Sequence, residues 1–355
     1  MKLKKFLFRI SFILILTLLF QSCLKDNVSP EVSFNLSSSY LLLKYVEDQG
    51  DYINSKDMPS IVDVDEVHNN LNYYLILDIR SVGDYELGHI PGAINILPDS
   101  LVDYLTIKNA VNRYIKVVIV STTGQSSSYF TCLLRLYGFH NVYSLNFGMA
   151  EWNKAFSEVW QNKLDDRKII FNFNNVVYKF GSKYPLPKFN LKFPDSSIQQ
   201  NSNQRILQLI KDGFTENGVY NGVYQGSNSN LNPSDYYIVC YGSYALYLHD
   251  KPSVTGSGHF ENALLYRPML DLKSTENLQT LPNDKSILVY SISGQQSAFV
   301  VAYLRLLGYD AKTLLYGGCN LFYGYLSLQR ASFIPYVFFG NNVRSYEFVT
   351  GTSPY

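Results

Sequence analysis

Two serine-rich segments carry the residue types best suited to chemistry in this chain. Each follows four apolar residues, and each has a glycine and then a glutamine at the same places. A serine hydroxyl is a weak nucleophile unless a base activates it, and neither first serine lies in a Gly-x-Ser-x-Gly pattern. If a helix begins after each glycine, its N-terminal amides favour a small anion. The candidate residues are Ser121, Thr122, Thr123, Gly124, Gln125, Ser126, Ser127, Ser291, Ile292, Ser293, Gly294, Gln295, Gln296 and Ser297.

The elements around these loops indicate a parallel α/β architecture. The apolar runs 117–120 and 287–290 predict buried strands that end at the loops. Amphipathic stretches at 129–137 and 299–307 predict the helices that follow, each closed by a glycine. Strand, helix and strand at this spacing predict a parallel sheet with helices outside. Further helices are predicted at 39–47 and 204–211, and a strand is predicted at 168–171.

The chain repeats itself at an offset of 170 residues. The matching pairs include Gly88-His89 and Gly258-His259, Leu134-Arg135-Leu136 and Leu304-Arg305-Leu306, and Gly148 and Gly318. No gap is needed from Gly88 to Gly148. Because so many glycine, serine and arginine positions share one register, the chain is predicted to hold two copies of one domain.

The first copy resembles rhodanese-like domains. Residues 77–81 (Leu-Asp-Ile-Arg-Ser) and 84–95 are similar to the opening motif of that family, and 138–143 is similar to its closing motif. In the second copy Cys240 and Gly242 stand near the aspartate and arginine positions. The resemblance implies two α/β domains, each a parallel sheet flanked by helices. It also implies structural roles for the residues Asp78, Arg80, His89 and His259.

In active rhodaneses a cysteine opens the loop and carries sulfur as a persulfide. The resemblance places Ser121 and Ser291 at that position, and neither loop has the arginine that commonly helps to bind the anionic donor. A persulfide requires an ionised thiolate, which serine does not supply. The substitution therefore predicts a binding or scaffolding module without sulfurtransferase activity.

Two alternatives remain open at this point. The loops could persist as receptors for sulfate, phosphate or a sulfur oxyanion. The chain could also be an enzyme, either a sulfurtransferase that uses Cys240 or Cys319 or an unrecognised hydrolase. No cofactor is expected, and no metal site, because the cysteines lack Cys-x-x-Cys spacing and the chain has only 5 histidines.

The N-terminal segment is typical of an export signal. A basic head precedes the apolar run 10–20, which is too short to span a bilayer. Cys23 follows, and the segment resembles a bacterial lipoprotein signal, which implies lipidation of Cys23 and anchoring on the periplasmic or cell-surface side of a membrane. The alternative is an ordinary signal peptide with a chance cysteine. The net charge of +1 argues against nucleic acid as a partner; a protein partner is not identified.

Together these features divide the chain into six predicted segments. They are a signal peptide (1–22), a lipidated tether (23–37), a first rhodanese-like domain (38–160), an interdomain connection (161–197), a degenerate second domain (198–345) and a C-terminal tail (346–355).

Overall fold

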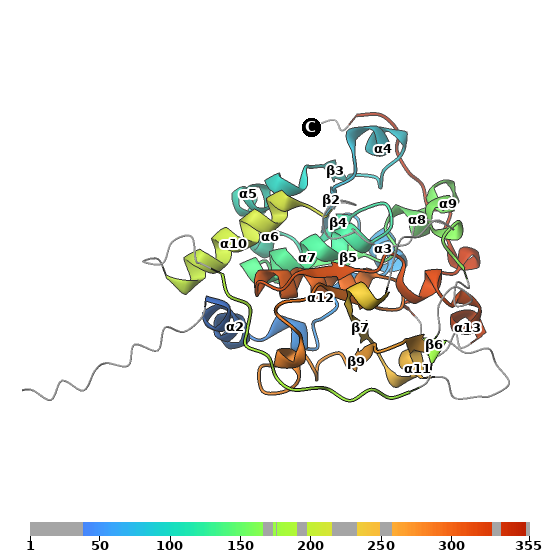
Figure 1. Ribbon diagram of the computed structural model, residues 1–355. Coiled ribbons are helices and arrows are strands. Elements are labelled where there is room, and N and C mark those ends of the chain that lie inside the picture. The colour runs from blue at the N-terminus through green and yellow to red at the C-terminus, as the bar shows by residue number, and fades with distance from the viewer. Residues whose placement is uncertain are drawn as a thin grey trace, which may run out of the picture. The chain divides into compact units, whose positions relative to one another are not determined.

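The structure is a computed structural model of the chain. It describes residues 38–165, 173–174, 176–189, 197–214, 233–248, 258–328 and 335–352. These residues belong to one compact unit, Ser37–Tyr355 (Figure 1). The predicted signal peptide 1–22, the tether with Cys23 and the predicted strand at 168–171 lie outside the described residues.

The first half is built on a five-stranded sheet in which all neighbouring strands are parallel. In spatial order its strands are β1 (Ile61–Val62), β5 (Val142–Leu145), β4 (Lys116–Val120), β2 (Tyr74–Asp78) and β3 (Ile94–Asn95). All residues of β2 are buried. A strand covered on both faces has this continuous apolar character.

The second half has a four-stranded sheet, again with parallel neighbours. Its strands are β11 (Ala311–Thr313), β10 (Ile287–Tyr290), β7 (Tyr237–Tyr241) and β9 (Leu264–Tyr266). A separate antiparallel pair joins β6 (Phe173–Asn174) to β8 (His259–Phe260). The prediction of an α/β protein with two parallel sheets flanked by helices is confirmed.

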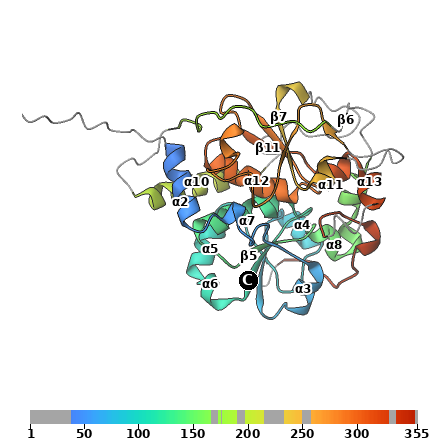
Figure 2. The ribbon, with the colours of Figure 1, turned by 90° about the horizontal axis from the view of Figure 1, so that it is seen from below.

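Helices flank both sheets (Figure 2). They are α2 (Ser38–Asp48), α3 (Val64–Asn69), α4 (Val82–Leu87), α5 (Leu101–Ile107), α6 (Ala110–Arg113), α7 (Gln125–Tyr137), α8 (Met149–Trp152), α9 (Glu158–Gln161), α10 (Ile198–Asp212), α11 (Tyr244–Tyr247), α12 (Gln295–Leu306) and α13 (Tyr323–Leu328). The helices predicted at 39–47 and 204–211 are present as α2 and α10. α10 begins earlier than predicted because Ser197 and Gln200 form a capping box there. None of the described helices is both long and apolar enough to cross a bilayer.

Helices α7 and α12 pack against each other where the two halves meet (Figures 1 and 2). Apolar residues of both helices, among them Leu133 and Val301, belong to one buried cluster that runs through both halves. In α12 every residue except Arg305 is buried. The amphipathic helix predicted at 299–307 is therefore buried on all sides instead, because its outer face is covered by the other half.

The two halves follow one plan, but the offset changes late in the second copy. The amide after Gly148 donates to the carbonyl of Ser121 (2.9 Å), and the amide after Gly317 donates to that of Ser291 (2.9 Å). Gly148 and Gly317 both have positive φ, so they are equivalents. They are 169 residues apart, which shows that the second copy lacks one residue. The predicted pairing of Gly148 with Gly318, without a gap, is therefore wrong.

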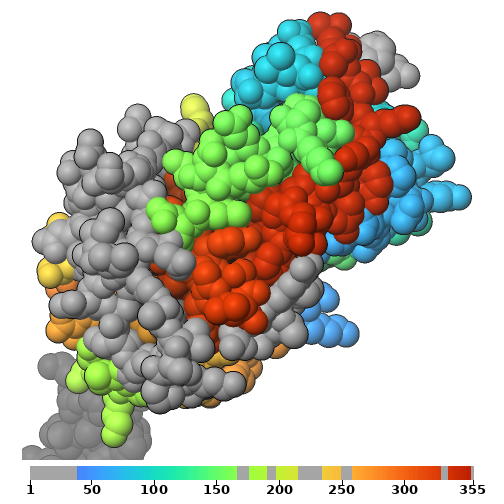
Figure 3. Space-filling view, turned by 90° about the vertical axis from the view of Figure 1, so that its right-hand side faces the viewer, coloured from blue at the N-terminus to red at the C-terminus, as the bar shows by residue number. Residues whose placement is uncertain are grey.

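The described C-terminal segment 343–352 runs back over the first half, where it lies beside the early part of the chain (Figure 3). Val349 and His89 exchange two backbone hydrogen bonds of 2.9 Å each. The indole N–H of Trp152 donates to the carbonyl of Glu347 (2.9 Å). Residues that follow the second repeat thus complete the surface of the first.

Candidate functional site

The first serine loop connects β4 to α7. The Oγ of Ser121 accepts hydrogen bonds from the amides of Gly124 (3.0 Å) and Ser127 (3.3 Å), and its hydroxyl donates to the Oγ of Ser127 (3.0 Å). Gly124 has φ +82°, a left-handed conformation that glycine adopts without strain. The loop amides therefore converge on the Ser121 side chain, which is 2% exposed.

The second loop has the same arrangement between β10 and α12. The Oγ of Ser291 accepts the amide of Ser297 (3.1 Å), and its hydroxyl donates to the Ser297 Oγ (3.3 Å). Gly294 also has φ +82°. Ser291 is 0% exposed, and every residue from 291 to 297 is buried. In the first loop, by contrast, Thr122 is exposed.

Each first serine belongs to a chain of neutral hydroxyls. The Ser127 Oγ lies 2.8 Å from the Oγ of Ser144 on β5, and the Ser297 Oγ lies 2.6 Å from the Oγ1 of Thr313 on β11. In the part of the chain that the structure describes, neither Ser121 nor Ser291 has a hydrogen bond to a histidine or carboxylate. Neither hydroxyl is thus positioned to lose its proton to a base.

A glutamine from each half reaches into the loop region of the other half. The Oε1 of Gln125 accepts the amide of Tyr316 (2.7 Å), and the Oε1 of Gln295 accepts the amide of Phe147 (3.2 Å). A side chain at Gly124 would collide with the Nε2 of Gln295, and one at Gly294 would collide with the Oε1 of Gln125. The two loops therefore face each other, and each is covered by the glutamine that begins the opposite helix.

Trp160 closes the first loop from the side. Its indole N–H donates to the carbonyl of Thr123 (3.1 Å), and the side chain is fully buried. Its ring stacks on Phe338 and meets Phe147 and Tyr316 edge-on. Sequence reasoning missed this tryptophan, since its spacing from the loop marks it only as a core residue.

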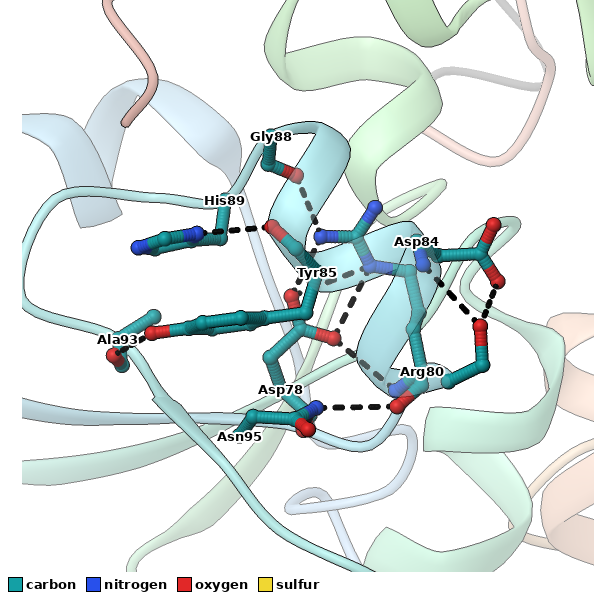
Figure 4. A network of polar contacts seen from close by, with 9 residues as sticks. Asp78, Arg80, Asp84, Tyr85, Gly88, His89, Ala93 and Asn95 are labelled. Atoms are coloured by element: carbon teal, nitrogen blue, oxygen red, sulfur yellow. Dashed lines mark hydrogen bonds and ion pairs between the residues drawn. The ribbon is translucent and has the colours of Figure 1, made fainter. Parts of the chain in front are cut away.

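Asp78 and Arg80 form a buried ion pair at the end of β2 (Figure 4). The Nη2 of Arg80 lies 2.6 Å from the Oδ2 of Asp78 and also donates to the carbonyl of Gly88 (2.7 Å). Asn95 donates from its side chain to the carbonyls of Asp78 and Arg80 (3.0 Å each). Arg80 thus joins the end of β2 to the turn after α4, and Asn95 joins β3 to the same strand end.

The two predicted structural histidines have the same environment in both halves. The Nδ1 of His89 donates to the carbonyl of Tyr85 (2.8 Å), and its ring stacks on the Tyr85 ring (Figure 4). The Nδ1 of His259 donates to the carbonyl of Tyr247 (2.8 Å) and stacks on that ring in the same way. Burial lowers the pKa of His259, so the ring is neutral near pH 7. Among the described residues, no hydrogen bond joins either histidine to Ser121 or Ser291.

Strand register identifies the residue that takes the position of Asp78 in the second half. Asp78 lies opposite Val120 in the first sheet, and Cys240 lies opposite Tyr290 in the second. Since Val120 and Tyr290 match in the repeat, Cys240 takes the place of Asp78.

The cysteines in the described part of the chain, Cys132, Cys240 and Cys319, are free and buried. Burial raises the pKa of Cys132, and it raises the pKa of Cys240 and of Cys319 to about 12. Because the thiolate is the nucleophilic form, burial in this fold favours the protonated, less reactive form of all three thiols.

Comparison with known proteins identifies the family of this chain. A family model, "Rhodanese-like domain", matches residues 63–155. Thiosulfate sulfurtransferase GlpE of Pseudoalteromonas translucida (strain TAC 125) is 32% identical over 84 residues, which cover 24% of this chain and 77% of the relative. Thiosulfate sulfurtransferase GlpE of Pseudomonas paraeruginosa (strain DSM 24068 / PA7) is 33% identical over 81 residues, which cover 23% of this chain and 71% of the relative. A solved thiosulfate sulfurtransferase from Pseudomonas aeruginosa shares 14% identity and covers 78% of this chain and 46% of its own, with a TM-score of 0.28. The chain belongs to the rhodanese-like domain family.

Proposed function

We propose that this chain is an exported, membrane-anchored rhodanese-like protein that transfers no sulfur and acts as a binding or scaffolding module. The environment of Ser121 carries the proposal. This serine follows the end of β4 and accepts the loop amides of Gly124 and Ser127. We infer that it stands where active relatives hold a nucleophilic cysteine, and that Ser291 is its counterpart in the second half.

The chemistry of sulfur transfer supports this inference. A thiolate must attack the outer sulfur of the donor, release the remainder as an anion and keep the sulfur as a persulfide. Serine has a hydroxyl that needs a base for ionisation, and the partners of Ser121 and Ser291 are amides and a neutral hydroxyl. The buried cysteines offer no replacement, since the raised pKa values keep Cys240 and Cys319 protonated.

The packing of the loops favours a binding module over the anion receptor. The amides that would hold an anion already donate to the Oγ of Ser121 and Ser291. The side chains of Gln125 and Gln295 lie across the loops. An anion would therefore have to displace protein acceptors that are in place.

The proposed anchor is the lipidated Cys23. Removal of residues 1–22 takes away four basic and no acidic residues, which leaves a net charge of −3. Attraction to anionic lipids therefore does not explain membrane attachment, whereas several acyl chains on one cysteine anchor a protein stably.

A thiosulfate-to-cyanide sulfur transfer assay tests the proposal. The full-length protein in detergent is compared with Ser121→Cys, Ser291→Cys and the control Ser126→Cys, which adds a thiol beside the proposed position. We expect wild type and Ser126→Cys at background. Ser291→Cys should stay silent because its loop is buried. Any sulfur transfer that a variant regains should appear in Ser121→Cys, where the neighbouring Thr122 is exposed. Wild-type activity that alkylation of thiols abolishes would contradict the proposal.

A further inference from the structure

A cavity lies at the C-terminal end of α7, away from the serine loops. It has a volume of about 520 Å³, which is within the range of pockets that bind small organic molecules. Its walls come from α2, from the segment after α2 and from the C-terminal end of α7, with Gln199 of α10 at one side. Arg135 of the cavity is about 15 Å along the helix from Gln125. The two sites are therefore separate.

Arg135 places a buried cation in the wall of this cavity and is 8% exposed. Its Nε donates to the carbonyl of Val142 (2.7 Å). The guanidinium carbon lies 4.6 Å from the centre of the Tyr143 ring and 5.6 Å from that of Tyr52. Among the described residues, the Nη2 has no hydrogen-bond partner and no carboxylate pairs with the guanidinium. Burial of an unpaired cation is costly, so this end of the guanidinium requires an acceptor.

We propose that the cavity binds a small organic monocarboxylate with an apolar or aromatic body. With its Nε bonded to Val142 and tyrosine rings beside it, the guanidinium has its buried Nη2 left without an acceptor, and a carboxylate oxygen is a strong acceptor for such a charged donor. Tyr45 and Tyr137 supply apolar wall for the rest of the ligand. Asp57 is exposed at the lining and repels a second negative charge, so a monoanion fits better than sulfate or phosphate.

Isothermal titration calorimetry on the full-length protein tests this site. The probes are 3-phenylpropionate and benzoate, with 3-phenylpropionamide as the uncharged match and sulfate as the inorganic anion. We expect binding of at least one carboxylate, and no binding of the amide or sulfate at the same concentration. No heat with either carboxylate, or equal binding of the amide, overturns the proposal. Binding of sulfate alone would also overturn it.

Variants assign the binding to the cavity. Arg135→Gln should weaken carboxylate binding on the order of 10- to 100-fold, the usual worth of hydrogen bonds to a charged group. Arg305→Gln is the matched control, because Arg305 is the repeat equivalent and does not line the cavity. Gln49→Trp places a large ring at an exposed position of the lining and should abolish binding without unfolding the protein. If Arg135→Gln does not fold, Gln49→Trp decides the outcome, and unchanged binding in the variant that folds overturns the proposal.

Discussion

Replacing the crossed glutamines tests how the two halves hold each other. In Gln125→Ala the buried amide of Tyr316 loses its acceptor at 2.7 Å. In Gln295→Ala the amide of Phe147 loses an acceptor at 3.2 Å. The Nε2 of Gln125 has a hydrogen bond to Thr123 (3.2 Å), whereas the Nε2 of Gln295 is buried with no partner among the described residues. Removal of Gln295 thus also removes an unsatisfied group, so Gln125→Ala should destabilise more.

The magnitudes follow from burial and hydrogen bonding. An orphaned buried amide costs about 1–3 kcal/mol, and each lost buried methylene adds about 0.8 kcal/mol. The higher helix propensity of alanine offsets about 0.4 kcal/mol of this destabilisation. We expect a loss of about 1.5–3.5 kcal/mol in unfolding free energy for Gln125→Ala and about 1–2 kcal/mol for Gln295→Ala. At about 2–4 °C per kcal/mol, the melting temperature should fall by about 3–14 °C for Gln125→Ala and by about 2–8 °C for Gln295→Ala.

Thermal unfolding followed by circular dichroism measures both variants. Gln208→Ala is the matched control, because Gln208 is an exposed glutamine in a helix, α10, and its loss should shift the transition by less than about 1 °C. The double variant should deviate from additivity by about 0.5 kcal/mol or more, because each glutamine packs on the loop that precedes the other. If both alanine variants melt like Gln208→Ala, the two glutamine contacts do not stabilise the protein and the reasoning is refuted. A larger loss for Gln295→Ala than for Gln125→Ala would also refute it.

Three further predictions concern single residues. Asp78→Asn should destabilise the first half by about 3–5 kcal/mol, since Arg80 is left as a buried unpaired charge. Urea unfolding measures this loss of stability, and Asp99→Asn at an exposed position is the control. Burial raises the pKa of Glu151 to about 8, so its folded state holds a proton that the unfolded chain has lost above about pH 4.3. Stability should therefore fall as pH rises from about 4.3 towards 8, and in Glu151→Gln that fall should be smaller; equal slopes in melting experiments at several pH values would exclude the effect. Cys23→Ser should release the protein from the membrane fraction and end labelling by radioactive palmitate, and continued labelling would disprove lipidation at this cysteine.

Local sequence patterns predicted much of the architecture, because runs of apolar residues indicate which segments are buried. The runs 117–120 and 287–290 are buried strands that lead into matching loops. The motif around Asp78 and Arg80 produces an ion pair at a strand end. These features depend on residues that are near one another in the chain or that match a repeated pattern.

Contacts between distant segments could not be read from the same patterns. Gln125 and Gln295 repeat in the sequence, but nothing local shows that each reaches the other half. The approach of Trp160 to the first loop and the return of residues 343–352 to the first half depend equally on how the halves dock. The offset change after α12 cannot be read from the sequence because Gly317 and Gly318 are adjacent. The positive φ of Gly317 and the hydrogen bond from the next amide to Ser291 distinguish them.

The exchange of glutamines between α7 and α12 gives one polypeptide the interface of a symmetric dimer. In an isologous interface residue i contacts j and j contacts i, and here Gln125 meets Tyr316 as Gln295 meets Phe147. In a homodimer one mutation alters both contacts together. In a fused chain a mutation changes only one of the two contacts. The two halves can therefore diverge in sequence on either side of the pseudo-twofold axis. One half can keep an ion pair at Asp78 while the other has Cys240, and the shared interface still holds both copies in place.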